Sequence, residues 1–261
     1  MGIRRVLACF LLAALATPAF ACTKKVRWHD DGLYFHKNAS GAVTGFSAEL
    51  TRELLRRLGC EVEFVEMPWA RGLAELEIGR IDIVPGTIIK PERRRYAYFS
   101  HITAQSQNAL FMSNSAAAKY PIKRLQDLSG SNFRLGVQIS VNYGDEFDLL
   151  AQQAQFRQIF KPVSARRNAW QMIQFDRLDG MIADLATGLK EIEQLGLSQS
   201  IRPSAILMKA DPATYAFSKR STTPEFVDQF DRAYAAMLAD GSHQKLVEKF
   251  LRGATITTHK E

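Results

Sequence analysis

The stretch GFSAELTRELLRRLGCEVEFVEMPWARGLAELEIGRIDIVPG, residues 45–86, decides the fold because it alternates helical and extended patterns. Large apolar residues recur every four positions in its first part, at Phe46, Leu50, Leu54 and Leu58. This spacing predicts an amphipathic helix that ends at Gly59. EVEFV (61–65) and RIDIVPG (80–86) then predict two strands, with a second helix between them at 69–79.

The alternation continues on both sides of this stretch. KVRWH (25–29) predicts a strand before the first helix, which completes a β-α-β-α-β unit and favours a parallel sheet covered by helices. A second such unit has predicted strands FRLGV, QFRQIFK and LDGMIAD and helices near 143–153 and 166–175. Two C-terminal helices are expected, one begun by Thr223 and Pro224 with a buried stripe and one near 242–251. The predicted stripe is Phe226, Phe230, Ala233 and Met237.

Two α/β units indicate two lobes. The join near 103–112 and the return near 205–217 are extended and lack helical periodicity, so we expect two hinge strands. Lobe one is then residues 22–105 together with 208–261, and lobe two is 106–207. A cleft between such lobes is a common ligand site, since open sheets bind ligands at the carboxyl ends of their strands.

The first 21 residues have the layout of a cleaved secretory signal peptide: two arginines, an apolar run at 6–16 and a small-x-small pattern at 19–21. The apolar run is too short for a stable membrane anchor. We therefore predict a soluble protein exported to the periplasm. The composition, 46% hydrophobic and 23% charged, is that of a globular protein. The formal net charge of +7 is spread along the chain, which argues against a nucleic-acid-binding face.

Two cysteines remain after the signal peptide, and they precede two predicted strands. If these strands are adjacent and parallel, Cys22 and Cys60 lie at the same sheet edge. Strand spacing of about 4.8 Å suits a disulfide. We predict a Cys22–Cys60 bridge. The alternative is a lipid-modified Cys22, although residues 19–21 lack the aliphatic residue usual in lipoprotein signals.

Residues 45–100 resemble the polar amino-acid family of periplasmic solute-binding proteins that serve ABC importers. The matching features are the Gly-Phe that opens the first helix, the PW turn, and KPER followed by FS. LQDLSGSNFRLGVQ (125–138), FDRLDGMIAD (175–184) and ADGSHQKLVEKF (239–250) resemble later parts of the same family. The resemblance implies the type II periplasmic binding protein fold, with two hinge strands and two lobes that close over one small solute.

The resemblance also implies a ligand set. Arg93 matches the arginine that holds the ligand's α-carboxylate, and Asp184 matches the aspartate that holds its α-ammonium, although Asp184 is also a natural N-cap for a following helix. The loop before Arg93 is one residue shorter than in many relatives. Thr87 is the expected hydroxyl donor there, with its backbone N–H as a second donor, and Gly86 is also placed in the ligand set. The further predicted ligand-binding residues are Asp31, Tyr34, Trp69, Gln138, Ser140 and Asn142.

The sequence therefore predicts a monomeric, non-enzymatic binding protein that delivers an amino acid or similar small carboxylate to a membrane permease. No cofactor motif and no histidine or cysteine spacing typical of a metal site is present. Two alternatives share the fold. One is a periplasmic enzyme similar to cyclohexadienyl dehydratase, with Asp30, Asp31 or Asp184 as general acid. The other is a ligand-sensing subunit for a membrane receptor.

Overall fold

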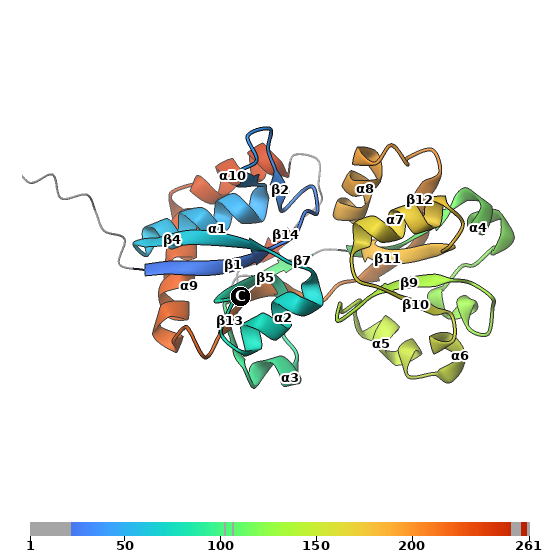
Figure 1. Cartoon of the computed structure of the whole chain (residues 1–261), viewed down its shortest axis with the longest axis horizontal. Helices are drawn as coiled ribbons and strands as arrows, with labels where there is room; N and C mark the ends of the chain where they lie inside the picture. The colour runs from blue at the N-terminus through green and yellow to red at the C-terminus, as the bar shows by residue number, and fades with distance from the viewer. Residues whose placement is uncertain (1–21, 102, 106, 252–256, 260–261) are drawn as a thin grey trace, which may run out of the picture.

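The computed structural model describes residues 22–101, 103–105, 107–251 and 257–259, which form two lobes (Figure 1). Each lobe holds one large sheet with helices packed around it. The predicted two-lobed α/β architecture is therefore confirmed. The signal peptide predicted for residues 1–21 lies outside the described residues. Within the described ranges, no helix has the length and apolarity needed to cross a membrane.

The first lobe contains a mixed sheet of order β14-β7-β13-β5-β1-β4, with β6 paired to β13. Its strands are β1 (Cys22–Trp28), β4 (Cys60–Glu66), β5 (Ile83–Ile88), β6 (Ala97–Phe99), β7 (Thr103–Gln105), β13 (Ala213–Ser218) and β14 (Thr257–His259). Its helices are α1 (Phe46–Arg57), α2 (Trp69–Glu77), α3 (Pro91–Arg94), α9 (Pro224–Ala239) and α10 (Ser242–Phe250). Strands β2 (His36–Lys37) and β3 (Val43–Thr44) form a small antiparallel hairpin. The part β5-β1-β4 is parallel, as the sequence predicts.

The second lobe contains a sheet of order β10-β9-β11-β8-β12. Its strands are β8 (Gln107–Ser113), β9 (Leu135–Gln138), β10 (Phe160–Val163), β11 (Gly180–Asp184) and β12 (Ile201–Lys209). Its helices are α4 (Asn114–Lys119), the 3₁₀ turn η1 (Leu125–Leu128), α5 (Asp145–Ala151), α6 (Ala154–Arg157), α7 (Arg166–Gln174) and α8 (Leu185–Gln194). β9 is parallel to β10 and β11, whereas β8 is antiparallel to β11 and β12.

Two chain segments connect the lobes. β7 belongs to the first sheet and β8 to the second, while β12 belongs to the second sheet and β13 to the first. The C-terminal helices α9 and α10 and strand β14 return to the first lobe (Figure 1). β12 extends to Lys209, beyond the boundary expected at 207. The antiparallel pairing of β13 with β5 arises because the chain re-enters the first lobe from the opposite direction.

Two local predictions were wrong. The strand predicted over QFRQIFK is a short helix, α6, followed by β10. A helical turn brings the rings of Phe156 and Phe160 to within 5.3 Å of each other in the core. In a continuous strand these two residues would share a face but stand about 13 Å apart along it. In α9 the buried stripe begins at Val227, and Phe226 is only partly buried, packed against Phe217.

The predicted disulfide is present. Cys22 and Cys60 are register partners on the adjacent parallel strands β1 and β4, with their Cα atoms 4.8 Å apart. The bridge joins residues that are 38 positions apart and packs at the edge of the first-lobe core. In this bridge Cys22 has no free thiol, so the structure supports the disulfide over lipid modification of Cys22.

Removing the bridge is expected to destabilise the first lobe. A Cys22→Ser, Cys60→Ser double variant should lose about 2–4 kcal/mol of unfolding free energy, because the unfolded chain gains the freedom of the opened loop. Urea unfolding of wild type and variant, each with and without reductant, measures this loss. Reductant should destabilise the wild type and leave the double variant unchanged. Equal stability of oxidised and reduced wild type would contradict the prediction.

Candidate ligand-binding site

A cavity of about 280 Å³ lies between the lobes and is lined by residues of both. The first lobe contributes the end of β1, the loop after it, the starts of α1 and α2, and the end of β5. The second lobe contributes the loop after β9, the end of β11 and the starts of α7 and α8. The carboxyl ends of parallel strands from both sheets therefore meet at one site, as expected for open α/β sheets.

Arg93 is a buried arginine on the short helix α3 at one edge of the cavity. Its Nη1 donates to the carbonyl oxygen of Ile88 at 2.9 Å, and its Nη2 donates to that of Ser140 at 3.1 Å. The indole Nε1 of Trp69 donates to the same Ser140 oxygen at 2.9 Å. Burial lowers the pKa of the Arg93 guanidinium from its ordinary value.

These contacts join the two lobes. Arg93 and Trp69 belong to the first lobe, and Ser140 belongs to the loop after β9 in the second. The ammonium of Lys90 also lies 3.2 Å from a carboxylate oxygen of Asp148 across the same boundary. One edge of the cavity is thus closed by hydrogen bonds and an ion pair between the lobes.

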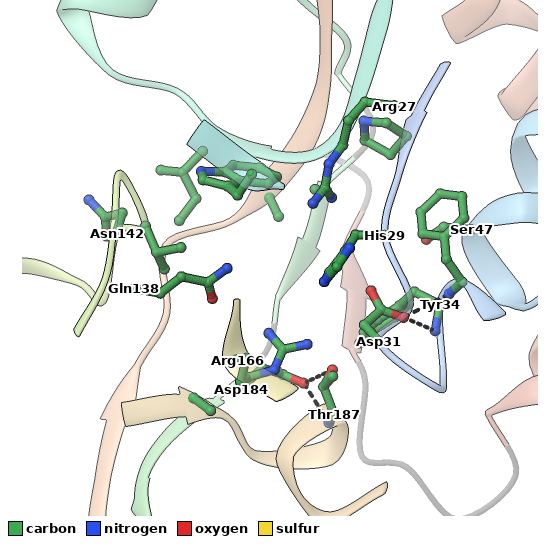
Figure 2. A pocket seen from close by; sticks show the side chains of 18 of the residues that line it. Arg27, His29, Asp31, Tyr34, Ser47, Gln138, Asn142, Arg166, Asp184 and Thr187 are labelled. Atoms are coloured by element: carbon green, nitrogen blue, oxygen red, sulfur yellow. Dashed lines mark hydrogen bonds between the residues drawn. The ribbon is translucent and has the colours of Figure 1, made fainter. Parts of the chain in front are cut away.

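Asp184 ends β11 and caps α8 in the second lobe, where it lines the cavity. Its Oδ1 accepts from the backbone N–H of Thr187 at 2.8 Å and from the Thr187 hydroxyl at 2.6 Å (Figure 2). The N-cap role expected from the sequence is therefore confirmed, and the same residue lines the cavity, where its role toward a ligand stays a prediction. The two bonds fix the carboxylate in place.

Arg166, the first residue of α7, lies beside Asp184 (Figure 2). It forms a two-bond ion pair with Glu191 of α8. The distances from Nε and Nη2 to the two carboxylate oxygens are 2.7 and 2.8 Å. Glu191 is 1% exposed and also accepts from the indole Nε1 of Trp170 at 2.6 Å. Burial alone would lower the pKa of Arg166, but Glu191, Asp31 and Asp184 together raise it well above its ordinary value.

The loop after β1 places Asp31 against the cavity. Its Oδ1 accepts from the backbone N–H groups of Tyr34 and Phe35 at 3.0 and 2.7 Å. Burial raises the pKa of the Asp31 carboxyl to about 7, even though Arg166 and the Phe35 N–H favour the charged form. Burial, Asp184 and Asp31 also raise the pKa of the Tyr34 hydroxyl well above its ordinary value.

Gly45 explains how this loop is held against α1. Its φ is +118°, and a Cβ there would lie 2.5 Å from the carbonyl oxygen of Tyr34. The close approach lets the backbone N–H of Ser47 donate to Tyr34 at 3.0 Å, and that of Phe46 donate to Leu33 at 3.2 Å. The glycine that opens the helix in the sequence therefore also positions the site loop.

Arg27 and His29 extend into the cavity from the end of β1 (Figure 2). Nε of Arg27 donates to the carbonyl oxygen of Met67 at 3.1 Å, and its guanidinium lies 5.3 Å from the Trp69 ring centroid. Burial lowers the pKa of Arg27 to about 10, although Asp31 acts in the opposite direction. Burial, Arg27 and Arg166 lower the pKa of His29.

Comparison with known proteins identifies the family. Residues 30–253 match the family model of bacterial extracellular solute-binding proteins, family 3. The chain belongs to this family. The resemblance stated from the sequence is confirmed, and this family-3 protein is a solute-binding protein.

Its curated relatives are named for different amino acids. The L-cystine-binding protein TcyJ of Escherichia coli K12 is 25% identical over 83% of this chain and 77% of its own length. The L-cystine-binding protein TcyA of Bacillus subtilis is 26% identical over 83% and 75%. The histidine-binding periplasmic protein of Salmonella typhimurium is 23% identical over 90% and 91%.

Solved structures share the fold. An ancestral arginine-binding protein bound to arginine has a TM-score of 0.73 and 24% identity, covering 87% of this chain and 97% of its own. An ancestral amino-acid-binding protein, described as a precursor of cyclohexadienyl dehydratase, has a TM-score of 0.67 and 26% identity, covering 87% and 95%. A histidine kinase sensor domain has a TM-score of 0.72 and 19% identity, covering 91% and 98%.

The structure of this solute-binding protein brings most of the predicted site residues to one cavity. Eight of them line it: Asp31, Tyr34, Trp69, Gly86, Arg93, Gln138, Asn142 and Asp184. Ser140 is exposed to solvent and is not among the residues that line the cavity. At the cavity edge it contributes only its carbonyl oxygen, which accepts from Trp69 and Arg93. Asn142 accepts from the backbone N–H of Gly144 at 2.7 Å, which fixes the loop after β9.

Thr87 does not line the cavity as the sequence predicted. It is fully buried, and its hydroxyl donates to the carbonyl oxygen of Val84 at 2.9 Å. The cause is a bulge in β5: Thr87 pairs with Thr214 and Pro85 with Tyr215, so Gly86 stands unpaired between them with φ +75°. A bulge redirects the next side chain, here into the core.

Other lining residues were not identified from the sequence. These are chiefly Arg27, His29, Ser47, Asn108, Arg166 and Glu191. The available signal was position, because Arg27 and His29 lie at the buried end of β1 and Arg166 begins α7 shortly after β10. Within the part of the chain that the structure describes, no group of three or more acidic, histidine or cysteine side chains is arranged to hold a metal ion.

Proposed function

We propose that this solute-binding protein captures an amino acid in the cavity between its lobes and delivers it to the permease of an ABC importer. Opposite charges from the two lobes carry the proposal: Arg93 comes from α3 of the first lobe, Asp184 comes from the end of β11 in the second, and both line the same cavity. Arg93 would hold the α-carboxylate and Asp184 the α-ammonium. The cystine-, histidine- and arginine-binding names of the relatives support an amino-acid ligand.

Closure of the lobes is the proposed working step. Trp69 and Tyr34 would form walls around the ligand, and Gly86, Gln138 and Asn142 would offer polar groups at the strand ends. A ligand carboxylate at Arg93 would compete with the Ser140 carbonyl for the same guanidinium N–H groups. The protein acts as a monomer in the periplasm, performs no covalent chemistry, and presents its closed form to the membrane partner.

Replacing Arg93 with alanine tests the proposed site. Ligands are first found by thermal-shift screening of amino acids and small carboxylates, and affinities are then measured by calorimetry. Loss of one charge-assisted clamp should weaken binding by roughly 1.5–3 kcal/mol, which is about tenfold to a hundredfold. Arg94→Ala is the matched control, because Arg94 is exposed on the same helix. Unchanged binding by Arg93→Ala together with weakened binding by Arg94→Ala would refute the assignment.

A second candidate function rests on Asp31. A carboxyl that lines the cavity and has a pKa of about 7 has the property required of a general acid. The purified protein should therefore be incubated with prephenate and with arogenate, and aromatic product should be followed over time. We expect no turnover. Turnover that disappears in Asp31→Asn would establish the dehydratase-like function in place of transport.

A further inference from the structure

The cavity contains a second buried arginine, Arg27. It has no role in the proposed binding of the ligand's α-carboxylate by Arg93 and of its α-ammonium by Asp184. Arg27 is 8% exposed and comes from the end of β1. Its aliphatic stem packs on Gly72, where a Cβ would lie 2.7 Å from the Arg27 Cγ. Its Nε bond to Met67 and the Trp69 ring hold the guanidinium from two further sides. The side chain is thus fixed before any ligand arrives.

The surrounding charges leave this guanidinium without a direct partner in the protein. Among the described residues, no ion pair involves Arg27, and its one hydrogen bond uses Nε. Arg166 differs, because Glu191 occupies it through two bonds. Figure 2 shows the terminal nitrogen atoms of Arg27 directed into the cavity, above His29. A buried cation that is held rigidly and faces a cavity is suited to bind an anion.

Trp69 places the two arginines on one wall. Its ring lies against the Arg27 guanidinium, and its indole N–H donates to the Ser140 carbonyl that also accepts from Arg93. The carboxylates of Asp31 and Asp184 come from other elements, the loop after β1 and the end of β11. The cavity therefore offers two cationic groups for carboxylates and at least one anionic group for an ammonium.

We propose that Arg27 is a second anion-recognition site, so that the ligand carries two carboxylates, one held by Arg93 and the other by Arg27. This inference rests on the proposed amino-acid-binding function and narrows it to dicarboxylic amino acids. The class includes amino acids with an acidic side chain and compounds with an amino-acid group at each end. A planar guanidinium can hold the second carboxylate through two parallel bonds, which distinguishes it from an uncharged amide.

The wild-type protein tests this with three matched pairs measured by calorimetry. The pairs are L-glutamate and L-glutamine, L-aspartate and L-asparagine, and L-cystine and the mixed disulfide of cysteine with cysteamine. Within each pair the second compound lacks only the second carboxylate charge or group. We expect the dicarboxylate of at least one pair to bind at least about tenfold tighter than its partner.

Arg27→Met should weaken binding of the dicarboxylate at least about tenfold more than binding of its monocarboxylate partner, so that the preference within the pair is lost. Arg71→Met is the matched control. Arg71 is exposed on α2 outside the cavity, and its replacement changes the net charge by the same amount. If Arg27→Met does not fold, the wild-type ratios alone decide. Equal affinities within every pair, or binding of other amino acids but no dicarboxylate, would overturn this inference and leave the amino-acid function standing. Failure of every amino acid to bind would overturn both.

Discussion

Replacing Glu191 with alanine is expected to lower the free energy of unfolding by about 3–5 kcal/mol. Glu191 is 1% exposed and neutralises Arg166 through two bonds of 2.7 and 2.8 Å. It also accepts the indole N–H of the fully buried Trp170. The alanine variant would leave a largely buried cation, 20% exposed, and a buried donor without their acceptor. Removing one partner of such a pair is more destabilising than removing both.

Urea unfolding followed by circular dichroism measures this loss. Glu193→Ala is the matched control on the same helix α8, because Glu193 forms an exposed ion pair with Lys190 at 2.8 Å. Exposed pairs contribute at most about 1 kcal/mol, so this variant should change little. A double variant, Arg166→Met with Glu191→Met, should recover part of the loss, since it removes both charges together. Similar small losses for Glu191→Ala and Glu193→Ala would contradict the buried-pair interpretation.

The sequence predicted those features that repeat or that follow from strand order. The four-residue spacing from Phe46 predicted α1, and the order of strands placed Cys22 beside Cys60. Arg93 and Asp184 were predicted through the family resemblance. The periodicity of a single element could not place the rest, because it does not indicate which side chains meet across two lobes.

Arg27 and Thr87 illustrate this limit: Arg27 lines the cavity but was not predicted, and Thr87 was predicted but does not line it. A charged residue in a strand has the same pattern whether it faces solvent or a cavity, and only the packing of Gly72 and Trp69 on Arg27 distinguishes the two. Thr87 follows a glycine at a strand end, where a hydroxyl donor was expected. The bulge at Gly86 reverses its direction, and a bulge depends on the pairing with β13, which lies far along the chain.

The stability of the ligand-free protein is expected to fall as pH rises from about 4 to about 7, through the titration of Asp31. The folded protein holds the Asp31 pKa at about 7, mainly through burial, against about 3.9 in an unfolded chain. The folded state therefore binds the proton more tightly, and stability present at low pH is lost as pH rises toward the folded pKa. The whole shift corresponds to about 4 kcal/mol.

Asp31→Asn isolates this contribution, because an amide oxygen can still accept from the Tyr34 and Phe35 N–H groups. Urea unfolding at pH 5 and pH 8 compares the variant with the wild type. From pH 5 to pH 8 the unfolding free energy of the variant should rise by about 2–3 kcal/mol relative to that of the wild type. Asp30→Asn, in the same loop, controls for the change of charge. If the difference between Asp31→Asn and wild type is the same at both pH values, then the Asp31 carboxyl is not held protonated by the fold, and a general-acid role for it loses its basis as well.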